Sequence, residues 1–337
     1  MMKRLIVFVC ALSVLAGACL AEVIMFPQPW REGGANLREM IADPEGWQES
    51  RKGVDTIGYW PWLMERDQDA ESQKRFFRCL KDWNKKLQFE VPIIKSFGWK
   101  EGKPPLDADE AFAFYMAQDR MFKKNGLVKV DSFCFDEPVY AARVVIPADI
   151  AGGQPPVPGF RMSDDPRVYI DYACRETAKF MKLMKKEYPE ARYMDIEPYP
   201  ALSLEELKYS VDILNRECKR LRIKGPDALR IDVDWGSMEA GVLSGSWAEL
   251  GELAGYVRSR GMDFSLIYWA ANQPSGDISM HWRNGVLHML DCTEKAGLKP
   301  DEYVLESWIQ MPNAFGPETD QTAYAGCLRD WLKLIKK

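Results

Sequence analysis

Two adjacent carboxylates, Asp136 and Glu137, end the stretch Val130–Pro138, which reads V-D-S-F-C-F-D-E-P. The apolar and aromatic residues before the acids favour a strand, and Pro138 stops it. A pair of carboxyl groups can perform acid/base chemistry, because different surroundings can hold the two groups in different protonation states. We therefore interpret Asp136 and Glu137 as the leading catalytic candidates.

Acids and aromatic side chains also stand at the ends of the other β-rich runs. Aromatic rings pack against the apolar faces of sugars, and carboxylates accept hydrogen bonds from sugar hydroxyls, so this combination indicates a carbohydrate site. The further catalytic candidates are Glu197 and Glu306. The expected substrate-binding residues are Trp60, Asp234, Trp235, Tyr268, Trp269, Asn272 and Trp308, and Trp30 and Trp62 follow the first two runs.

The elements that would position these residues alternate regularly along the chain. Short β-rich runs are followed by longer amphipathic runs, several with clear boundary signals such as the capping box Ser203 and Glu206. Eight such units predict an α/β fold, a (β/α)8 TIM barrel, with an open doubly wound sheet as the alternative. The predicted strands are Val23–Pro27, Val54–Trp60, Phe89–Phe97, Val130–Asp136, Arg192–Glu197, Leu229–Asp234, Asp263–Trp269 and Tyr303–Trp308.

Alternation within the strands predicts which side chains face the barrel interior. In the fifth strand Asp195 and Glu197 alternate with Met194 and Ile196, and the sixth and eighth strands alternate acids and apolar residues in the same way. Successive side chains point to opposite faces of a strand. We expect the acids to face the interior and the apolar side chains to face the helices. Several buried carboxylates in one interior favour a functional site, whereas for the two deeper acids, Asp195 and Asp232, internal salt bridges with Lys95 or a nearby arginine are the favoured interpretation.

The connection after the fourth strand is unusually long and contains Ala141–Asp165, which is rich in proline and glycine. We predict a long loop insertion over residues 141–165, either a lid or subsite wall beside the acidic pair or a surface excursion. Residues 1–21 read as a signal peptide, and residues 22–337 as one (β/α)8-barrel catalytic domain.

The proposed signal peptide has a basic start, an apolar run and small residues near its end. It predicts export, to the periplasm or the extracellular space, with no integral membrane segment after cleavage. A lipid anchor at Cys19 is the less favoured alternative, because Ala16 stands where lipoprotein signals usually have leucine. The six remaining cysteines do not form close pairs, and Cys174 with Cys218 is the candidate disulfide.

Composition excludes several classes of function. The formal net charge of −5 does not indicate a basic patch, so we expect no nucleic-acid partner. The two histidines, His281 and His288, are predicted to be ordinary residues of one helix, which argues against Ser-His-Asp catalysis and histidine-ligated metallohydrolase chemistry. No glycine-rich nucleotide loop is present. We predict neither a cofactor nor a metal; the sequence does not indicate an oligomeric state.

The motif Asp136-Glu137-Pro138 at the end of the fourth strand resembles the Asp-Glu pair of β-N-acetylhexosaminidases of glycoside hydrolase families 20 and 123. The resemblance implies that Glu137 is the general acid/base. It also implies that Asp136 orients the 2-acetamido group of the substrate, which acts as the nucleophile.

The pair also resembles the Asn-Glu-Pro motif of the large retaining clan of glycoside hydrolase barrels, whose nucleophile is a glutamate on the seventh strand. Here Asp136 replaces the asparagine, and the seventh strand, F-S-L-I-Y-W-A-A-N, has no carboxylate. Glu306, in L-E-S-W, would fit if the strands are numbered differently. Glu197 is the other candidate partner of Glu137.

These observations predict an exported glycoside hydrolase that cleaves an oligo- or polysaccharide by carboxylate acid/base catalysis, with a substrate-assisted route on an N-acetylhexosaminide as one mechanism. A non-catalytic carbohydrate-binding barrel is the alternative. A third interpretation is an acid-lined site for a divalent metal ion.

Overall fold

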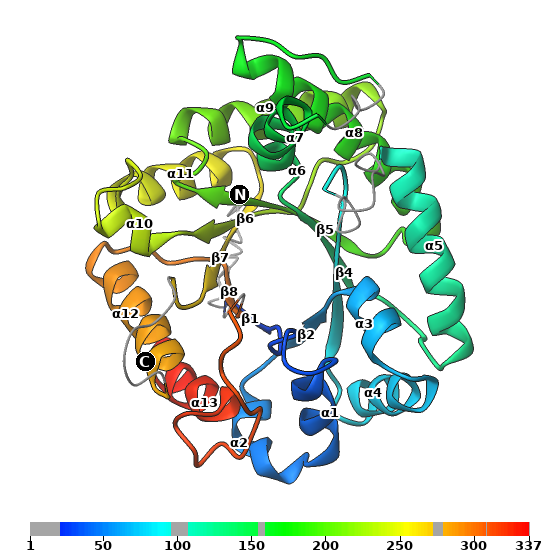
Figure 1. Cartoon of the computed structure of the whole chain (residues 1–337), viewed down its shortest axis with the longest axis vertical. Coiled ribbons are helices and arrows are strands. Elements are labelled where there is room, and N and C mark those ends of the chain that lie inside the picture. Colours follow the sequence, from blue (N-terminus) through cyan, green and yellow to red (C-terminus); the bar gives the residue numbers. More distant parts are fainter. Residues whose placement is uncertain (1–20, 96–106, 154–158, 272–278, 308, 337) are drawn as a thin grey trace, which may run out of the picture.

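The computed structural model describes residues 21–95, 107–153, 159–271, 279–307 and 309–336. Eight parallel strands follow one another around a closed barrel, and β8 pairs with β1 to close it. Figure 1 shows the strands in the middle of the molecule and the helices around them. The protein is therefore a (β/α)8 TIM barrel, as predicted, and not an open sheet.

The strands and helices alternate along the whole described chain. The strands are β1 (Glu22–Met25), β2 (Thr56–Tyr59), β3 (Lys86–Val91), β4 (Ser132–Asp136), β5 (Arg192–Tyr199), β6 (Ala228–Val233), β7 (Asp263–Tyr268) and β8 (Glu302–Leu305). The helices are α1 (Ala35–Ala42), η1 (Glu45–Trp47), α2 (Gln48–Lys52), α3 (Pro61–Asp67), α4 (Ala70–Asp82), α5 (Ala108–Lys124), α6 (Pro138–Tyr140), the π-helix η3 (Ala141–Val145), α7 (Ile146–Ala151), α8 (Pro166–Glu187), α9 (Leu204–Arg220), α10 (Trp235–Glu239), α11 (Trp247–Ser259), α12 (His281–Lys295) and α13 (Tyr324–Ile335).

Each predicted strand overlaps an observed one, and the predicted capping box at the start of α9 is confirmed. Ser203 accepts a hydrogen bond from the Glu206 amide, and the Glu206 carboxylate accepts one from the Ser203 amide. The largest boundary difference concerns β3, which ends at Val91 and not at Phe97. Glu90 and Val91 therefore stand at the carboxyl end of this strand.

The prediction of an irregular loop over residues 141–165 is wrong for its first part. Residues 138–151 form α6, η3 and α7 in direct succession. Pro147 lies at the start of α7, a position that proline tolerates because its fixed φ suits a helix. Proline is therefore compatible with helix here, and the described residues 152–153 and 159–165 are turns or irregular chain.

Strand register shows which side chains face the barrel interior. Arg230 is buried, and its guanidinium donates across the interior to Gln88 of β3 (2.6 Å), Ser265 of β7 (3.0 Å) and Glu302 of β8 (3.2 Å). Ile196 lies beside Arg230 in the register of β5 and β6, so it also faces inward.

The predicted orientation of β5 is therefore wrong. Met194 shares the parity of Ile196 and faces the interior, whereas Asp195 and Glu197 face the surrounding helices. On β6 and after β8, the expected inward orientation of Asp232 and Glu306 agrees with the structure. Alternation alone predicts two faces but does not say which face is the interior.

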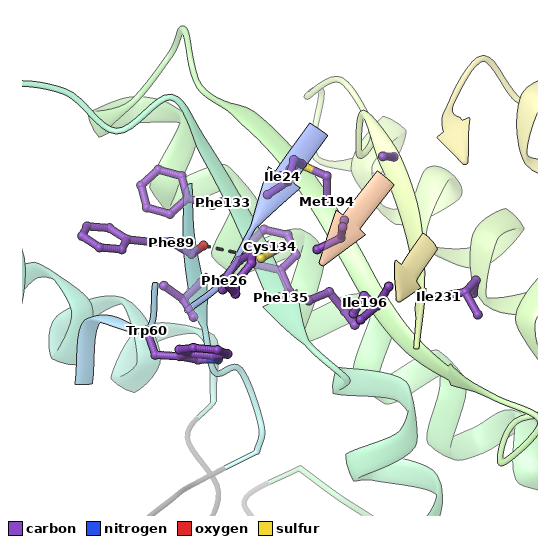
Figure 2. Close-up of a cluster of buried hydrophobic side chains, with 14 of the residues drawn as sticks. Ile24, Phe26, Trp60, Phe89, Phe133, Cys134, Phe135, Met194, Ile196 and Ile231 are labelled. Carbon is purple, nitrogen blue, oxygen red and sulfur yellow. Dashed lines mark hydrogen bonds between the residues drawn. The ribbon is translucent and has the colours of Figure 1, made fainter. Parts of the chain in front are cut away.

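Apolar side chains fill the interior above the Arg230 layer. Figure 2 shows Ile24, Phe26, Cys134 and Met194 gathered between the strands, whereas the rings of Phe89 and Phe133 point away from that group. All six side chains are buried. The interior of the barrel is thus packed rather than open, as in other barrels of this class.

Two further predictions concern cysteines and membrane segments. Cys174 and Cys218 are both free thiols, so the candidate disulfide is wrong. Their sulfurs contact other groups: Cys174 donates to the Ser210 carbonyl oxygen, and Cys218 contacts the Met181 sulfur.

Within the described ranges, every helix is too short or too polar to cross a membrane.

Gly58 of β2 provides a test of the packing of apolar side chains inside the barrel. A Cβ atom at Gly58 would lie 2.2 Å from two ring atoms of Phe26, and the Phe26 ring packs on Trp60 at 5.1 Å between centroids. We expect Gly58→Ala to lower the free energy of unfolding by about 1–3 kcal/mol, measured by urea denaturation.

Gly255→Ala is the matched control, because a Cβ at this position of α11 has no neighbour within 4 Å among the described residues. It should be neutral or stabilise the protein by up to about 1 kcal/mol. Equal effects of the two substitutions would contradict the described packing of the interior.

Candidate functional site

Asp136 and Glu137 share one cation at the carboxyl end of the barrel. The Lys95 ammonium lies 2.9 Å from Asp136 Oδ1 and 2.7 Å from Glu137 Oε2. The side chain of Glu137 is 14% exposed and that of Asp136 5%. The structure thus brings the two predicted acids together with a lysine that follows β3, and Glu137 is the more accessible of the two.

Two unusual backbone conformations position this ion-paired group. Glu137 adopts the left-handed conformation (φ 47°, ψ 50°) between β4 and α6, and Ile94, next to Lys95, has φ 68°. Left-handed conformations of non-glycine residues cost about 1–3 kcal/mol and are concentrated at functional sites. The surrounding structure must therefore stabilise both turns.

Glu197 stabilises the turn that carries Glu137. Its carboxylate accepts hydrogen bonds from the amides of Val139 (2.7 Å) and Tyr140 (3.0 Å), at the start of α6. Glu197 is fully buried on the helix side of β5. The prediction that it faces the interior as a catalytic partner is therefore corrected: Glu197 is a positioning residue that holds the segment after Glu137.

Three more carboxylates face the same end of the interior. Glu90 and Glu306 are fully buried, and Asp232 is partly buried. Glu90 accepts a 2.6 Å hydrogen bond from the Trp60 indole nitrogen. Among the described residues, neither oxygen of Glu306 has a hydrogen-bond partner. We did not predict Glu90 as a site residue, because the expected third strand continued to Phe97. The alternation of Glu90 with the apolar Phe89 and Val91 could have indicated that it faces the interior.

Burial and mutual repulsion favour the protonated forms of these acids. Burial raises the pKa of Glu90, and Asp136 adds to the rise; burial, Glu90 and Asp232 raise the pKa of Glu306. Burial and then Glu137 raise the pKa of Asp232. These directions are expected where like charges share a poorly solvated space.

Glu137 experiences opposing effects. Burial raises its pKa, the Lys95 ammonium lowers it, and Asp136 raises it again, so the pKa remains above the usual value. Burial lowers the pKa of Lys95, but Asp136 and Glu137 outweigh this and raise it, so the lysine stays charged. Glu137 is thus a partly buried carboxyl group with a raised pKa, the property required of a general acid.

The predicted aromatic residues separate into two groups. Tyr268 faces the helices, where it packs against Tyr303 and Trp331 and is fully buried, so its prediction as a substrate contact is wrong. Trp60 is also buried, with its ring against Phe26, and is part of the packed interior.

Trp235 packs against α12, with its ring 4.9 Å from His288, and donates to the Trp269 carbonyl oxygen (3.0 Å). Trp269 is partly exposed, and its indole nitrogen donates to the Val233 carbonyl oxygen (3.0 Å). Of these aromatic residues, Trp269 therefore keeps a position from which a ring could contact a ligand.

Trp30 and Trp62 form an aromatic pair at the same end of the barrel. Their ring centroids are 6.2 Å apart, and Trp30 is 36% exposed. Asp234, predicted to bind substrate, is partly buried and accepts a hydrogen bond from the Ser237 amide as the N-cap of α10. Asn272 and Trp308 lie outside the described residues.

The observed strand order argues against the resemblance to the large retaining clan of glycoside hydrolase barrels. Glu306 follows β8, and β7 together with the described residues after it, up to Ala271, has no carboxylate at its carboxyl end. The seventh-strand nucleophile of the large retaining clan therefore has no counterpart among the described residues. The interior acids also do not form a group with metal-ligand spacing in the described part of the chain.

A groove of about 650 Å³ lies at the opposite end of the barrel, near the starts of β3 and β4. One acid, Asp131, lines it together with a set of basic residues. These are Lys74, Arg78, Lys81, Lys85, Lys124 and Lys129. The expectation that the surface has no basic patch is wrong here, because net charge sums the whole surface. The absence of a nucleic-acid partner stays a prediction.

Comparison with known proteins supports the fold. No family model and no curated protein sequence matches the chain. Among solved structures, it resembles the native xylanase 10B of Thermotoga maritima (TM-score 0.53, 11% identity, covering 94% of this chain and 97% of that chain). It also resembles a candidate α-L-fucosidase of Bacteroides thetaiotaomicron (0.51, 12%, 99% of both chains) and a β-glucosidase of Exiguobacterium marinum (0.50, 13%, 88% and 86%).

Several similar structures are thus TIM-barrel glycoside hydrolases. At 11–13% identity the likeness shows the fold alone. It does not identify families 20 or 123, so the specific chemistry has to be argued from the site.

The unpaired state of Glu306 predicts a pH-dependent stability. A glutamate of the unfolded chain has a pKa of about 4.3, whereas the pKa of Glu306 is raised in the folded protein. Between the two pKa values the folded state binds more protons, so stability falls as pH rises. We expect Glu306→Gln to be more stable than the wild type at about pH 8, with the difference shrinking toward about pH 4, in urea denaturation.

Glu302→Gln is the matched control on the same side of β8. Glu302 is equally buried but lies 2.6 Å from Arg192 and 3.2 Å from Arg230. Removing its charge takes away the ion-pair partner that Arg230 has among the described residues, so we expect a loss of about 3 kcal/mol. If Glu306→Gln destabilised the protein as much as Glu302→Gln at about pH 8, the description of Glu306 as an unpaired acid would be incorrect.

Proposed function

We propose that the protein is a glycoside hydrolase in which Glu137 is the general acid/base and Asp136 its orienting partner. The observation that carries the proposal is the ion-paired group of Lys95, Asp136 and Glu137 at the carboxyl end of the barrel. Active sites of (β/α)8 barrels lie at this end. Glu137 is accessible and has a raised pKa, which suits proton transfer to a leaving group.

Several carboxylates near Glu137 are candidates for the second catalytic group. Glu197 is removed from consideration because it faces the helices, and Glu306 is fully buried. Asp136 is adjacent to Glu137 and contacts the same lysine, which favours a substrate-assisted reaction on an N-acetylhexosaminide. Asp232, partly buried on β6, is the alternative partner, as in glycosidases that use two carboxylates.

In the substrate-assisted reaction, Glu137 donates its proton to the glycosidic oxygen as the bond from that oxygen to the anomeric carbon breaks. The carbonyl oxygen of the 2-acetamido group, oriented by Asp136, forms the new bond to the anomeric carbon. Water then attacks this carbon, and the Glu137 carboxylate accepts the proton of that water. The acetamido group is released unchanged, and Glu137 regains its proton.

Aromatic side chains around this end could hold the sugar rings. The partly exposed Trp269 and the pair of Trp30 and Trp62 are the candidates that the packing supports. We also propose that residues 1–21 direct export, to the periplasm or the extracellular space, where polysaccharide substrates are encountered.

Glu137→Gln tests the catalytic assignment. The amide keeps the shape of the side chain but cannot transfer the proton, so we expect kcat/KM to fall by about 10²–10⁴-fold, while binding of the sugar changes little. The assay uses nitrophenyl N-acetyl-β-glucosaminide and N-acetyl-β-galactosaminide beside nitrophenyl β-glucoside and β-xyloside. Glu205→Gln, at an exposed position of α9, is the control and should keep full activity.

Different results would correct different parts of the proposal. Cleavage of the plain glycosides alone would contradict the substrate-assisted route and favour Asp232 as the partner. Glycan binding without cleavage of any glycoside would favour the non-catalytic carbohydrate-binding barrel. Unchanged activity of Glu137→Gln would contradict the assignment of the acid.

The role of Lys95 predicts a shift in the pH profile. The ammonium lowers the pKa of Glu137, so replacing it in Lys95→Met should raise that pKa further. The acid must be protonated to act, and activity is lost as pH rises through its pKa. The basic limb of the kcat/KM profile is therefore expected to move to higher pH. A limb that moved to lower pH, or stayed in place, would contradict this electrostatic role.

A further inference from the structure

Glu239, His288 and Cys292 form a compact group on the outer surface, away from the acids of the interior. His288 and Cys292 are four residues apart on α12, which places them on one face of the helix. Glu239 is the last residue of α10 and meets them there. In the described part of the chain, this is the group whose ligand atoms have the spacing of a metal site, all within 4.8 Å of one another.

The distances within the group match the edges of a tetrahedron around zinc. Zn–S bonds of about 2.3 Å and Zn–N or Zn–O bonds of about 2.0 Å place sulfur roughly 3.5 Å from the other ligand atoms, and nitrogen roughly 3.3 Å from oxygen. Cys292 Sγ lies 3.5 Å from Glu239 Oε1 and 3.6 Å from His288 Nε2. His288 Nε2 lies 2.9 and 3.1 Å from the two Glu239 oxygens.

We propose that Glu239, His288 and Cys292 bind one zinc ion, with water as the fourth ligand. A thiolate, an imidazole and a carboxylate in tetrahedral spacing suit Zn²⁺ better than Mg²⁺ or Ca²⁺, which take oxygen ligands in larger numbers. Zinc replaces the proton of the Cys292 thiol, which is released to solvent, and binds the unprotonated Nε2 of His288. The oxidation state of the metal and the protein does not change.

The packing around this group restrains one of its ligands. The ring of Trp235 packs on His288 at 4.9 Å between centroids and limits its rotation, and the Trp235 indole nitrogen holds the Trp269 carbonyl oxygen. Zinc would thus connect α10, which follows β6, to α12, which follows β7. It would stiffen two neighbouring connections at the carboxyl end of the barrel without contacting Glu137.

The experiment uses the whole chain after treatment with a chelator and dialysis. We expect calorimetric titration with ZnCl₂ to show one ion per chain, and CoCl₂ to give the thiolate-to-cobalt charge-transfer band of a cysteine-ligated, tetrahedral ion. Cys292→Ser should abolish this band and weaken zinc binding at least about 10-fold, and His288→Gln should also weaken binding. Zinc should raise the Tm of the wild type but not that of Cys292→Ser.

Cys79→Ser is the matched control, because Cys79 is also a partly buried free thiol but lies on α4. It should keep the cobalt band, the zinc affinity and the zinc-dependent rise in Tm. The absence of a thiolate band in the wild type, or its persistence in Cys292→Ser, would overturn the proposal. Neither readout depends on sugar cleavage, so the result is independent of the proposed hydrolase activity.

Discussion

The contact of Lys95 with Asp136 and Glu137 determines the electrostatics of the carboxyl end of the barrel. Several carboxylates share a poorly solvated space there, and they cannot all ionise together. The lysine provides a positive charge directly beside Asp136 and Glu137, so these two groups differ from the other interior acids in their surroundings. Because different surroundings give neighbouring acids different protonation states, one group can donate a proton while the other remains charged.

The contact of Lys95 with Glu137 depends on a backbone turn that is stabilised from the helix side of the sheet. The left-handed turn at Glu137 is followed at once by α6, whose first amides are bound by the buried Glu197 carboxylate. Glu197 therefore acts on the site chiefly by holding the backbone that follows Glu137. A buried carboxylate on the helix side can be as necessary for the position of an acid as a residue that contacts the substrate.

Much of the fold could be predicted from the sequence, because eight repeated strand and helix patterns leave few closed arrangements. The same pattern placed Asp136, Glu137 and Glu306 correctly at strand ends. The orientation of β5 could not be predicted, because the amides that bind Glu197 belong to α6, a short helix that was not predicted from the sequence. Glu90 was missed through a wrong strand boundary. The proximity of Glu239 to His288 arises only from folding, since the two residues lie far apart in the chain.

Arg230 connects strands from both halves of the barrel. Its hydrogen bonds reach Gln88 on β3, Ser265 on β7 and Glu302 on β8, so its charge is neutralised only after the last strand has joined the sheet. An isolated amino-terminal half of this chain would contain the buried Gln88 without Arg230, and an isolated carboxyl-terminal half would contain Arg230 with Glu302 but without Gln88. The interior of the barrel is therefore expected to be complete only after its carboxyl-terminal strand has left the ribosome, because Glu302 on β8 pairs with Arg230.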